Sequence, residues 1–93
     1  MIRSFADAET EKVWNGDRSR RLPGDMQAVA LRKLRMVAAA RQLLDLRIPP
    51  NNRLEKLSGA RRGRWSIRIN QQWRVCFDWR ENNAENVEIL DYH

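Results

Sequence analysis

Hydrophobic and polar residues alternate with a period of two over much of the second half of the chain. Three segments show this alternation, at residues 64–69, 73–79 and 87–90. A two-residue period is typical of β-strands that bury one face. Polar residues at 70–72 and 81–84 separate the segments. We therefore expect three antiparallel strands joined by short turns.

The first half of the chain follows the helical period instead. Residues 6–14 predict a short helix, which Asp7 or Ser4 would cap and which Asn15-Gly16-Asp17 would end. A longer helix is predicted to start near Pro23-Gly24-Asp25, because proline and a carboxylate both suit a first helical turn.

The longer helix carries one apolar stripe at helical spacing. The stripe consists of Val29, Ala30, Leu34, Val37 and Ala38. The basic residues that lie largely off it are Arg32, Lys33 and Arg35. We expect the helix to run to about Ala40. Residues 43–46 would extend it or form a further turn, before Pro49-Pro50 stops it.

These periods predict a single α+β domain over residues 1–93, with the helices packed on one face of the sheet. Residues 2–5 are β-compatible and would add a short leading strand. Ninety-three residues are too few for two independent cores. A hydrophobic fraction of 42%, which includes four tryptophans, suffices for one core. The strand tryptophans expected in that core are Trp65, Trp73 and Trp79.

The alternation of the strands also bears on function. If the apolar residues Trp65, Ile67, Val75 and Phe77 face the helices, the intervening residues face away from them together. These intervening residues are Arg64, Ser66, Arg68 and Arg74. We expect this face to expose several arginines and to offer a cradle for a phosphate backbone. The alternative is an ordinary solvated strand face.

The charge of the chain favours a nucleic-acid partner. The formal net charge is +6, and 15 of the 18 basic residues are arginine. The planar guanidinium of arginine suits phosphate better than the compact ammonium of lysine does. Between residues 53 and 80 there are eight basic residues and only two acids. The residues we expect to contact RNA are Arg53, Lys56, Arg61, Arg62, Arg64 and Arg68.

Composition excludes several other classes of protein. Cys76 and His93 are the only cysteine and histidine, so we expect no internal disulfide, no metal site and no cofactor. There is no glycine-rich phosphate loop. A serine-hydrolase triad could be drawn from Ser58 or Ser66 with His93 and Asp91, but no local sequence signature supports it. The first residues lack the apolar run of a signal peptide, and charges interrupt every segment of transmembrane length. We expect a soluble cytoplasmic protein.

Metal-free cleavage of RNA makes smaller demands on the protein. The ribose 2′-hydroxyl is the nucleophile, so the protein supplies a base, an acid and a cation. Asp91, Tyr92 and His93 offer titratable groups, and Arg74 offers the cation. In a regular strand, Asp91 and His93 would project from one face and Tyr92 from the other. The alternative is a structural or solvated position for the terminal residues, and for Arg74 an ion pair with Asp91 or Glu88.

Several short motifs follow one another in a recognisable order along the whole chain. They lie at residues 1–5, 53–59 with Arg61 and Gly63, 65–70, 72–77 and 87–93. Trp-Ser-Ile, Trp-Arg-Val-Cys-Phe and the final Asp-Tyr-His are the most specific of them. The set resembles the HigB-type toxins of the RelE-like branch of bacterial toxin–antitoxin systems. This resemblance implies a small RelE-like fold, with two N-terminal helices packed on one face of a curved, mainly antiparallel sheet.

The resemblance also implies an activity and its partners. HigB-type toxins cleave mRNA in the ribosomal decoding site during translation. Arg74 matches a family arginine near the scissile phosphate, and the matches to the family's C-terminal active residues are Asp91, Tyr92 and His93. The implied partners are a HigA-type helix-turn-helix antitoxin, the ribosome and mRNA. Operator DNA would be contacted only through the complex with the antitoxin.

One segment departs from the family pattern. Where some members have a histidine and a lysine before the first long strand, this chain has Glu55 and Ser58, with Lys56 and Arg61 nearby. Neither an ammonium nor a guanidinium is an easy acid–base group at neutral pH. Two interpretations stay open: slower chemistry, or proton transfer that depends more on the C-terminal acid and histidine.

Two other functions remain as alternatives from the sequence. A gyrase-directed toxin like the ParE relatives would share the architecture without needing an Asp-Tyr-His end. A non-catalytic co-repressor module would use its basic surface to bind operator DNA, with a steep dependence on salt. The terminal tripeptide together with Arg74 favours the nuclease over both.

Overall fold

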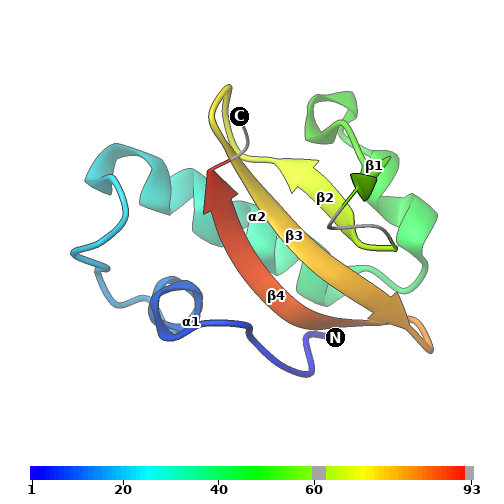
Figure 1. The fold of residues 1–93 in the computed structure, drawn as a ribbon, viewed down its shortest axis with the longest axis horizontal. Helices are drawn as coiled ribbons and strands as arrows, with labels where there is room; N and C mark the ends of the chain where they lie inside the picture. The colour runs from blue at the N-terminus through cyan, green and yellow to red at the C-terminus, as the bar shows by residue number, and fades with distance from the viewer. Residues whose placement is uncertain (60–62, 92–93) are drawn as a thin grey trace.

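Helices occupy the first half of the chain and strands the second half (Figure 1). The computed structural model describes residues 1–59 and 63–91. The helices are α1 (Ala8–Trp14), η1 (Gly24–Met26), α2 (Gln27–Ala39), η2 (Leu43–Arg47) and η3 (Pro50–Asn52), of which the three η elements are 3₁₀ helices. The strands are β1 (Glu55–Lys56), β2 (Trp65–Arg68), β3 (Trp73–Arg80) and β4 (Asn83–Asp91).

The strands form an antiparallel sheet in the order β1-β2-β3-β4. The strand β1 was not predicted, because its two charged residues carry no alternation for a pattern to detect. It pairs only with Trp65 and Ser66, so the remainder of β2 forms an edge of the sheet within the described ranges. The predicted leading strand at residues 2–5 is wrong as a strand, because this segment makes only isolated parallel bridges, Ile2 to Ala84 and Phe5 to Val87.

The connection between β3 and β4 is tighter than the sequence suggested. Glu81 and Asn82 both have positive φ, at 51° and 60°. Two successive residues with positive φ match the right-handed twist of a hairpin. Asn83 and Ala84, expected in the turn, already belong to β4. The two longest strands of the sheet therefore meet in a two-residue turn.

The core lies between the sheet and the helices α1 and α2. Ala30, Leu34 and Val37 of α2 are fully buried against the sheet residues Val75 and Phe77. In Figure 1, α2 passes behind the strands and α1 lies beside β4. The three strand tryptophans are half-buried and pack against this core, as expected. The burial of this apolar face stabilises the sheet on which the other face is built.

The short helix α1 is fixed at both ends. The Asp7 carboxylate accepts a hydrogen bond from the Thr10 amide at 2.7 Å, which makes Asp7 the N-cap. Gly16 follows the helix with φ of 84°, a conformation that favours glycine. The Thr10 hydroxyl accepts a hydrogen bond from the amide of Ile89 at 2.9 Å. This bond ties α1 to β4.

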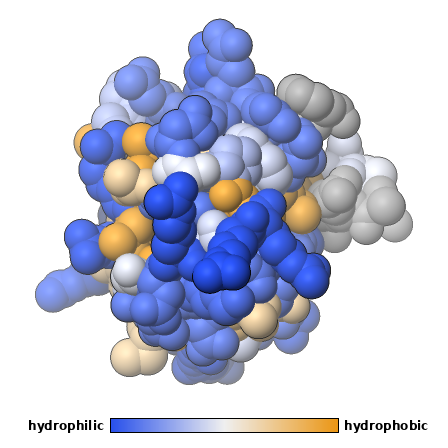
Figure 2. Space-filling model, turned by 90° about the vertical axis from the view of Figure 1, so that its left-hand side faces the viewer, coloured by the Kyte–Doolittle hydropathy of each residue, from blue (hydrophilic) through white to orange (hydrophobic). Residues whose placement is uncertain are grey.

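The outer surface is mostly polar. Figure 2 shows the side of the molecule that lies at the left of Figure 1, where hydrophobic residues appear only in small separated patches. In the residues that the structure describes, none of the helices has the length and apolar character needed to cross a membrane.

Candidate functional site

The sheet face turned away from α1 and α2 is partly buried, contrary to the sequence prediction. Ser66 and Cys76 on this face are 0% exposed, and Arg74 is 8% exposed. The prediction that this face exposes its arginines is therefore wrong for Arg74. The physical reason is that residues 53–55 contact its guanidinium. A strand pattern carries no information about a loop that covers the strand.

Several oxygen atoms hold the Arg74 side chain in place. Its Nε donates to the Ser66 hydroxyl at 2.7 Å, and its Nη2 donates to the backbone carbonyl of Arg53 at 2.7 Å. The Glu55 carboxylate lies 3.7 Å from the same Nη2. Arg53 presents its carbonyl from a left-handed conformation, with φ of 45°, which strains a residue with a side chain. The Arg74 guanidinium is thus oriented before any ligand binds.

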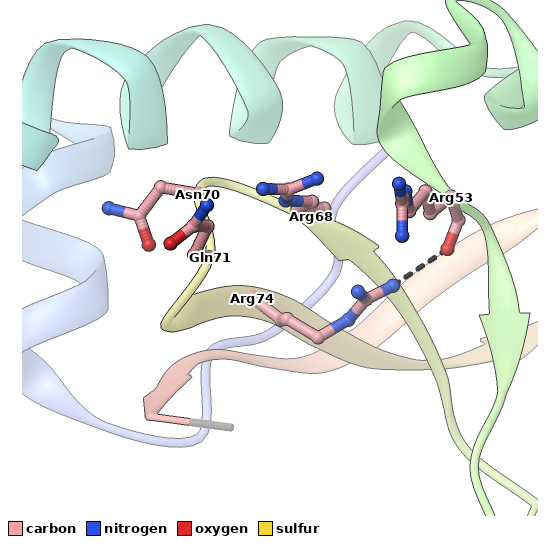
Figure 3. Close-up of a pocket in the computed structure, with 5 residues that line it drawn as sticks. All are labelled: Arg53, Arg68, Asn70, Gln71 and Arg74. Carbon is pink, nitrogen blue, oxygen red and sulfur yellow. Dashed lines mark hydrogen bonds between the residues drawn. The ribbon is translucent and has the colours of Figure 1, made fainter. Parts of the chain in front are cut away.

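A cavity of about 370 Å³ opens beside this guanidinium. Its lining consists of Arg53, Arg68, Asn70, Gln71 and Arg74. Figure 3 shows the two amide side chains at one end of this hollow, Arg53 at the other end and Arg68 between them. We call this space the Arg74 cavity. Among the described residues, its lining contains three guanidinium groups and no carboxylate.

The register of the sheet places like charges together at the Arg74 cavity. Arg68 of β2 is the direct cross-strand partner of Arg74 of β3. Two cations in this position repel each other and destabilise the pairing. An anion placed between them would remove the repulsion, and guanidinium groups bind phosphate through paired hydrogen bonds. The arrangement therefore favours binding of a phosphate or a similar anion.

Arg64, another predicted RNA-binding residue, has a different environment. Its side chain is 18% exposed and forms ion pairs with Asp78, at 3.3 Å, and with Glu88. It also donates to the backbone carbonyl of Asn86. Two carboxylates thus offset its charge. The structure places Arg64 in a structural ion-pair cluster, outside the lining of the Arg74 cavity.

The other predicted contact residues are divided among several places. Arg53 and Arg68 line the Arg74 cavity. Lys56 is exposed on β1, and its ammonium lies 5.8 Å from the centre of the Trp65 ring, within reach of a cation–π interaction. Four predicted site residues lie outside the described residues: Arg61, Arg62, Tyr92 and His93.

Asp91 is the last residue of β4 and pairs with Trp73 in the sheet. Leu90 is the residue opposite Arg74, so Asp91 projects from the face opposite to that of Arg74. Its carboxylate accepts a hydrogen bond from the Gln72 side chain at 2.9 Å. Gln72 belongs to the turn between β2 and β3, and other residues of this turn line the Arg74 cavity. The end of β4 therefore lies beside the rim of this cavity.

Sequence reasoning missed the role of Lys33. Lys33 is 6% exposed, and its Nζ donates to the side chain of the buried Asn52 at 2.6 Å. Burial, and then the charge of Arg32, lower the pKa of Lys33. The signal was present, because Lys33 lies four residues after Val29 and four before Val37, on the apolar stripe itself. Asn70 and Gln71 were missed because they were assigned only to a turn.

The described residues contain no cluster of three or more histidine, cysteine, aspartate or glutamate side chains placed to hold a metal ion. The side chains that the structure brings together at the site are cations, amides and carboxylates. Fixed guanidinium groups can stabilise negative charge that develops on a phosphate.

Comparisons with known proteins agree with the resemblance. Residues 3–93 match the family of HigB-like toxins, described as the RelE-like toxin of the type II toxin–antitoxin system HigB. Toxin HigB-1 of Vibrio cholerae serotype O1 is 40% identical over 94 residues, which cover 100% of this chain and 98% of that toxin. An uncharacterised protein of Haemophilus influenzae is 40% identical over 78 residues, covering 84% of this chain and 76% of that protein.

A solved structure supports the fold independently of sequence. The YoeB-YefM complex from Staphylococcus aureus contains a chain that aligns with a TM-score of 0.61 at 15% identity. The alignment covers 100% of this chain and 98% of the other. At this identity the likeness bears on the fold alone, and it agrees with the predicted RelE-like fold. On the family match and the full-length relative, the chain belongs to the HigB family of RelE-like toxins of type II toxin–antitoxin systems.

Proposed function

We propose that this toxin is a ribosome-dependent endoribonuclease that cleaves mRNA during translation and so arrests growth. The observation that supports the proposal is the Arg74 cavity, whose lining, in the part of the chain that the structure describes, holds three guanidinium groups and no carboxylate. A chain of RNA carries a phosphodiester that such a cavity would bind. Membership of the HigB family makes mRNA the substrate we infer.

In the proposed reaction the ribose 2′-hydroxyl attacks the adjacent phosphate. The 2′ oxygen loses its proton to a base and forms a bond to phosphorus, and the bond to the 5′ oxygen breaks as an acid protonates that oxygen. Arg74 stabilises the additional negative charge on the phosphate oxygens. The proposed proton-transfer groups are Asp91, Tyr92 and His93.

Glu55 adds a carboxylate to this machinery. It occupies the position where some relatives have histidine, and it contacts the Arg74 guanidinium at 3.7 Å. With a side chain that is 46% exposed, this carboxylate is open to solvent and to a bound substrate. We infer that the toxin depends on the ribosome because it holds few acid–base groups of its own. The ribosome would supply the in-line orientation of the mRNA.

The proposed partners follow from the family. A HigA-type antitoxin would silence the toxin, and operator DNA would be bound only through that complex. The proposed site of action is the cytoplasm, where translating ribosomes are found.

The test is inducible expression in bacteria without the antitoxin, combined with mapping of transcript 5′ ends. We expect growth arrest and cuts within translated frames. Both should be lost with Arg74→Ala and strongly reduced by deletion of His93. Arg74→Lys serves as a second variant if the alanine variant fails to fold, since a lysine cannot reproduce the bidentate geometry.

Arg80→Ala is the matched control, because it removes one charge from the same strand. Arg80 is 72% exposed and lies at the far end of β3 from Arg74, beside Glu85. This variant should retain both arrest and cuts. Growth arrest without cuts would instead support the gyrase-directed alternative, and its marker would be stabilised gyrase–DNA cleavage complexes. No arrest would support a binding module.

A further inference from the structure

A second cavity adjoins the Arg74 cavity on the side of α2. It has a volume of about 290 Å³ and is lined by Val29, Arg32, Lys33, Asn51, Arg68, Ile69 and Asn70. Two of these residues, Arg68 and Asn70, also line the Arg74 cavity. The two cavities therefore lie on either side of the same side chains. We call the second one the Lys33 cavity.

Arg68 can border both cavities because β1 is short. Its two residues leave Ile67 and Arg68 at the edge of the sheet. Arg68 can therefore reach both the Arg74 side and the α2 side. In Figure 3, α2 passes directly above Arg68 and the turn residues Asn70 and Gln71.

The Lys33 cavity is as cationic as its neighbour. The described residues of its lining hold two guanidinium groups, one ammonium and two amides, and no carboxylate. In the described part of the chain, no carboxylate forms an ion pair with Arg32, Lys33 or Arg68. Buried charges are normally paired or bound to a ligand. Here the ammonium of Lys33 hydrogen bonds only to a neutral amide oxygen of Asn52 among the described contacts.

The same segment of chain holds both cavities in position. Asn52 accepts from Lys33 and donates to the carbonyl groups of Leu46 and Ile48, at 3.1 and 3.3 Å. The next residue, Arg53, presents its carbonyl to Arg74. The inner wall of the Lys33 cavity, at Lys33 and Asn52, is thus held by buried hydrogen bonds, while Arg32, Asn51 and Asn70 are exposed at its opening.

We propose that the Lys33 cavity is a second phosphate subsite, which binds a neighbouring phosphodiester of the same RNA strand whose scissile phosphate occupies the Arg74 cavity. The inference rests on the proposed binding of RNA at Arg74. Arg32 and Arg68 contact the phosphate oxygens, while the amides of Asn51 and Asn70 suit ribose hydroxyls or base edges. A bound anion also opposes the effects of burial and of Arg32 that lower the pKa of Lys33.

The test compares RNA ligands that carry one phosphodiester with ligands that carry three. All of them contain 2′-O-methyl groups, which prevents attack by the 2′ oxygen. Binding to the full-length toxin is followed by NMR titration of backbone amides at several salt concentrations. Arg32→Gln is the informative variant, because Arg32 is exposed and lines the Lys33 cavity but not the Arg74 cavity. The matched control is Arg35→Gln, which removes an exposed charge one turn away on the same helix.

We expect Arg32→Gln to weaken binding of the three-phosphodiester ligand about fivefold. Its salt dependence should also fall by about 0.7 in the slope of log K against log salt. Binding of the one-phosphodiester ligand should not change, and Arg35→Gln should behave as the wild type. The amide signals around Arg32 and Lys33 should shift only with the longer ligand.

Three results would overturn the subsite. They are equal effects of the two variants, equal affinity of the wild type for both ligands, and no detectable binding of either ligand. Failure of the proposed cleavage is distinguishable from these, because it appears as missing cuts in transcripts while the length-dependent binding persists. If transcripts are still cut but Arg32→Gln does not change RNA binding, the proposed subsite is contradicted and the proposed nuclease activity stands.

Discussion

Two arginines on the same face of the sheet have opposite electrostatic surroundings. Arg64 is held by Asp78 and Glu88, so its charge is offset by two carboxylates. Arg74 donates to neutral oxygens of Ser66 and Arg53, and the half-exposed Glu55 carboxylate lies 3.7 Å from it. Neutral acceptors fix a guanidinium without cancelling its charge.

The difference separates a structural arginine from a candidate site arginine. Both residues are largely buried, and both belong to the segment that the sequence marks as basic. Burial alone does not distinguish them. What distinguishes them is their position: Arg74 lines a cavity together with Arg53 and Arg68, whereas Arg64 lies in a cluster with two carboxylates. A concentration of positive charge around a cavity attracts an external phosphate.

The largest expected effect is a loss of cleavage when Arg74 is replaced by glutamine, compared with the same replacement of Arg64. Arg74→Gln should lower cleavage of translated mRNA about 100- to 1,000-fold, because it removes a charged donor to the transition state. Arg64→Gln should leave most of the cleavage intact. Primer extension on a translated reporter transcript would measure both. Similar losses in the two folded variants would contradict the distinction.

Arg64→Gln should instead reduce stability. The substitution leaves Asp78 and Glu88 without their cation, and we expect the free energy of unfolding to fall by about 1–3 kcal/mol. Urea denaturation followed by tryptophan fluorescence would report the change. Arg80→Gln provides the control, since its exposed ion pair with Glu85 should contribute less than about 1 kcal/mol. An unchanged midpoint for Arg64→Gln would show that the cluster is not structural.

Arg53 allows the side chain and the backbone to be examined separately. Arg53→Gly and Arg53→Ala both remove the guanidinium, so both should lower cleavage by about tenfold. Only glycine relieves the left-handed conformation, at φ of 45°. The glycine variant should therefore unfold with a free energy up to about 1 kcal/mol higher than that of the alanine variant. Cleavage that recovers with glycine would show that backbone strain, and not charge, matters at this position.

The smallest effect concerns the pH dependence of stability. The pKa of Lys33 is lowered in the folded state from 10.5, so in the window below 10.5 the unfolded state binds more protons. The free energy of unfolding contributed by Lys33 should then rise with pH up to that value. The wild type should gain stability relative to Lys33→Met between neutral and alkaline pH in urea denaturation. Parallel pH profiles for the two proteins would contradict the assignment.

The sequence predicted the site only in part. Arg74 could be found because its motif is local and resembles the family's motif. Asn70 and Gln71 could not, because they belong to a turn whose side chains acquire a role only when they meet Arg53 from another part of the chain. The roles of Asp91, Tyr92 and His93 stay predictions that the variants above address.

The sequence by itself determined the class of the fold and the family. Both depend on signals that are local along the chain: a helical period, a two-residue period and short ordered motifs. Such signals specify which faces are apolar and which segments pair, and the predicted α+β architecture followed from them. The strand β1 was not predicted, because its two charged residues carry no periodic signal.

Only the tertiary structure decided which basic residues line a cavity and which ones form ion pairs with two carboxylates. Arg64 pairs with a carboxylate 24 residues away, and Arg74 binds a carbonyl 21 residues away. These contacts depend on strand register and on the path of the loop before β2, neither of which a residue pattern specifies. The potential around a charge depends on every group close to it in space. For this reason, Arg64 and Arg74, which the strand pattern places on the same face of the sheet, have different surroundings in the folded protein.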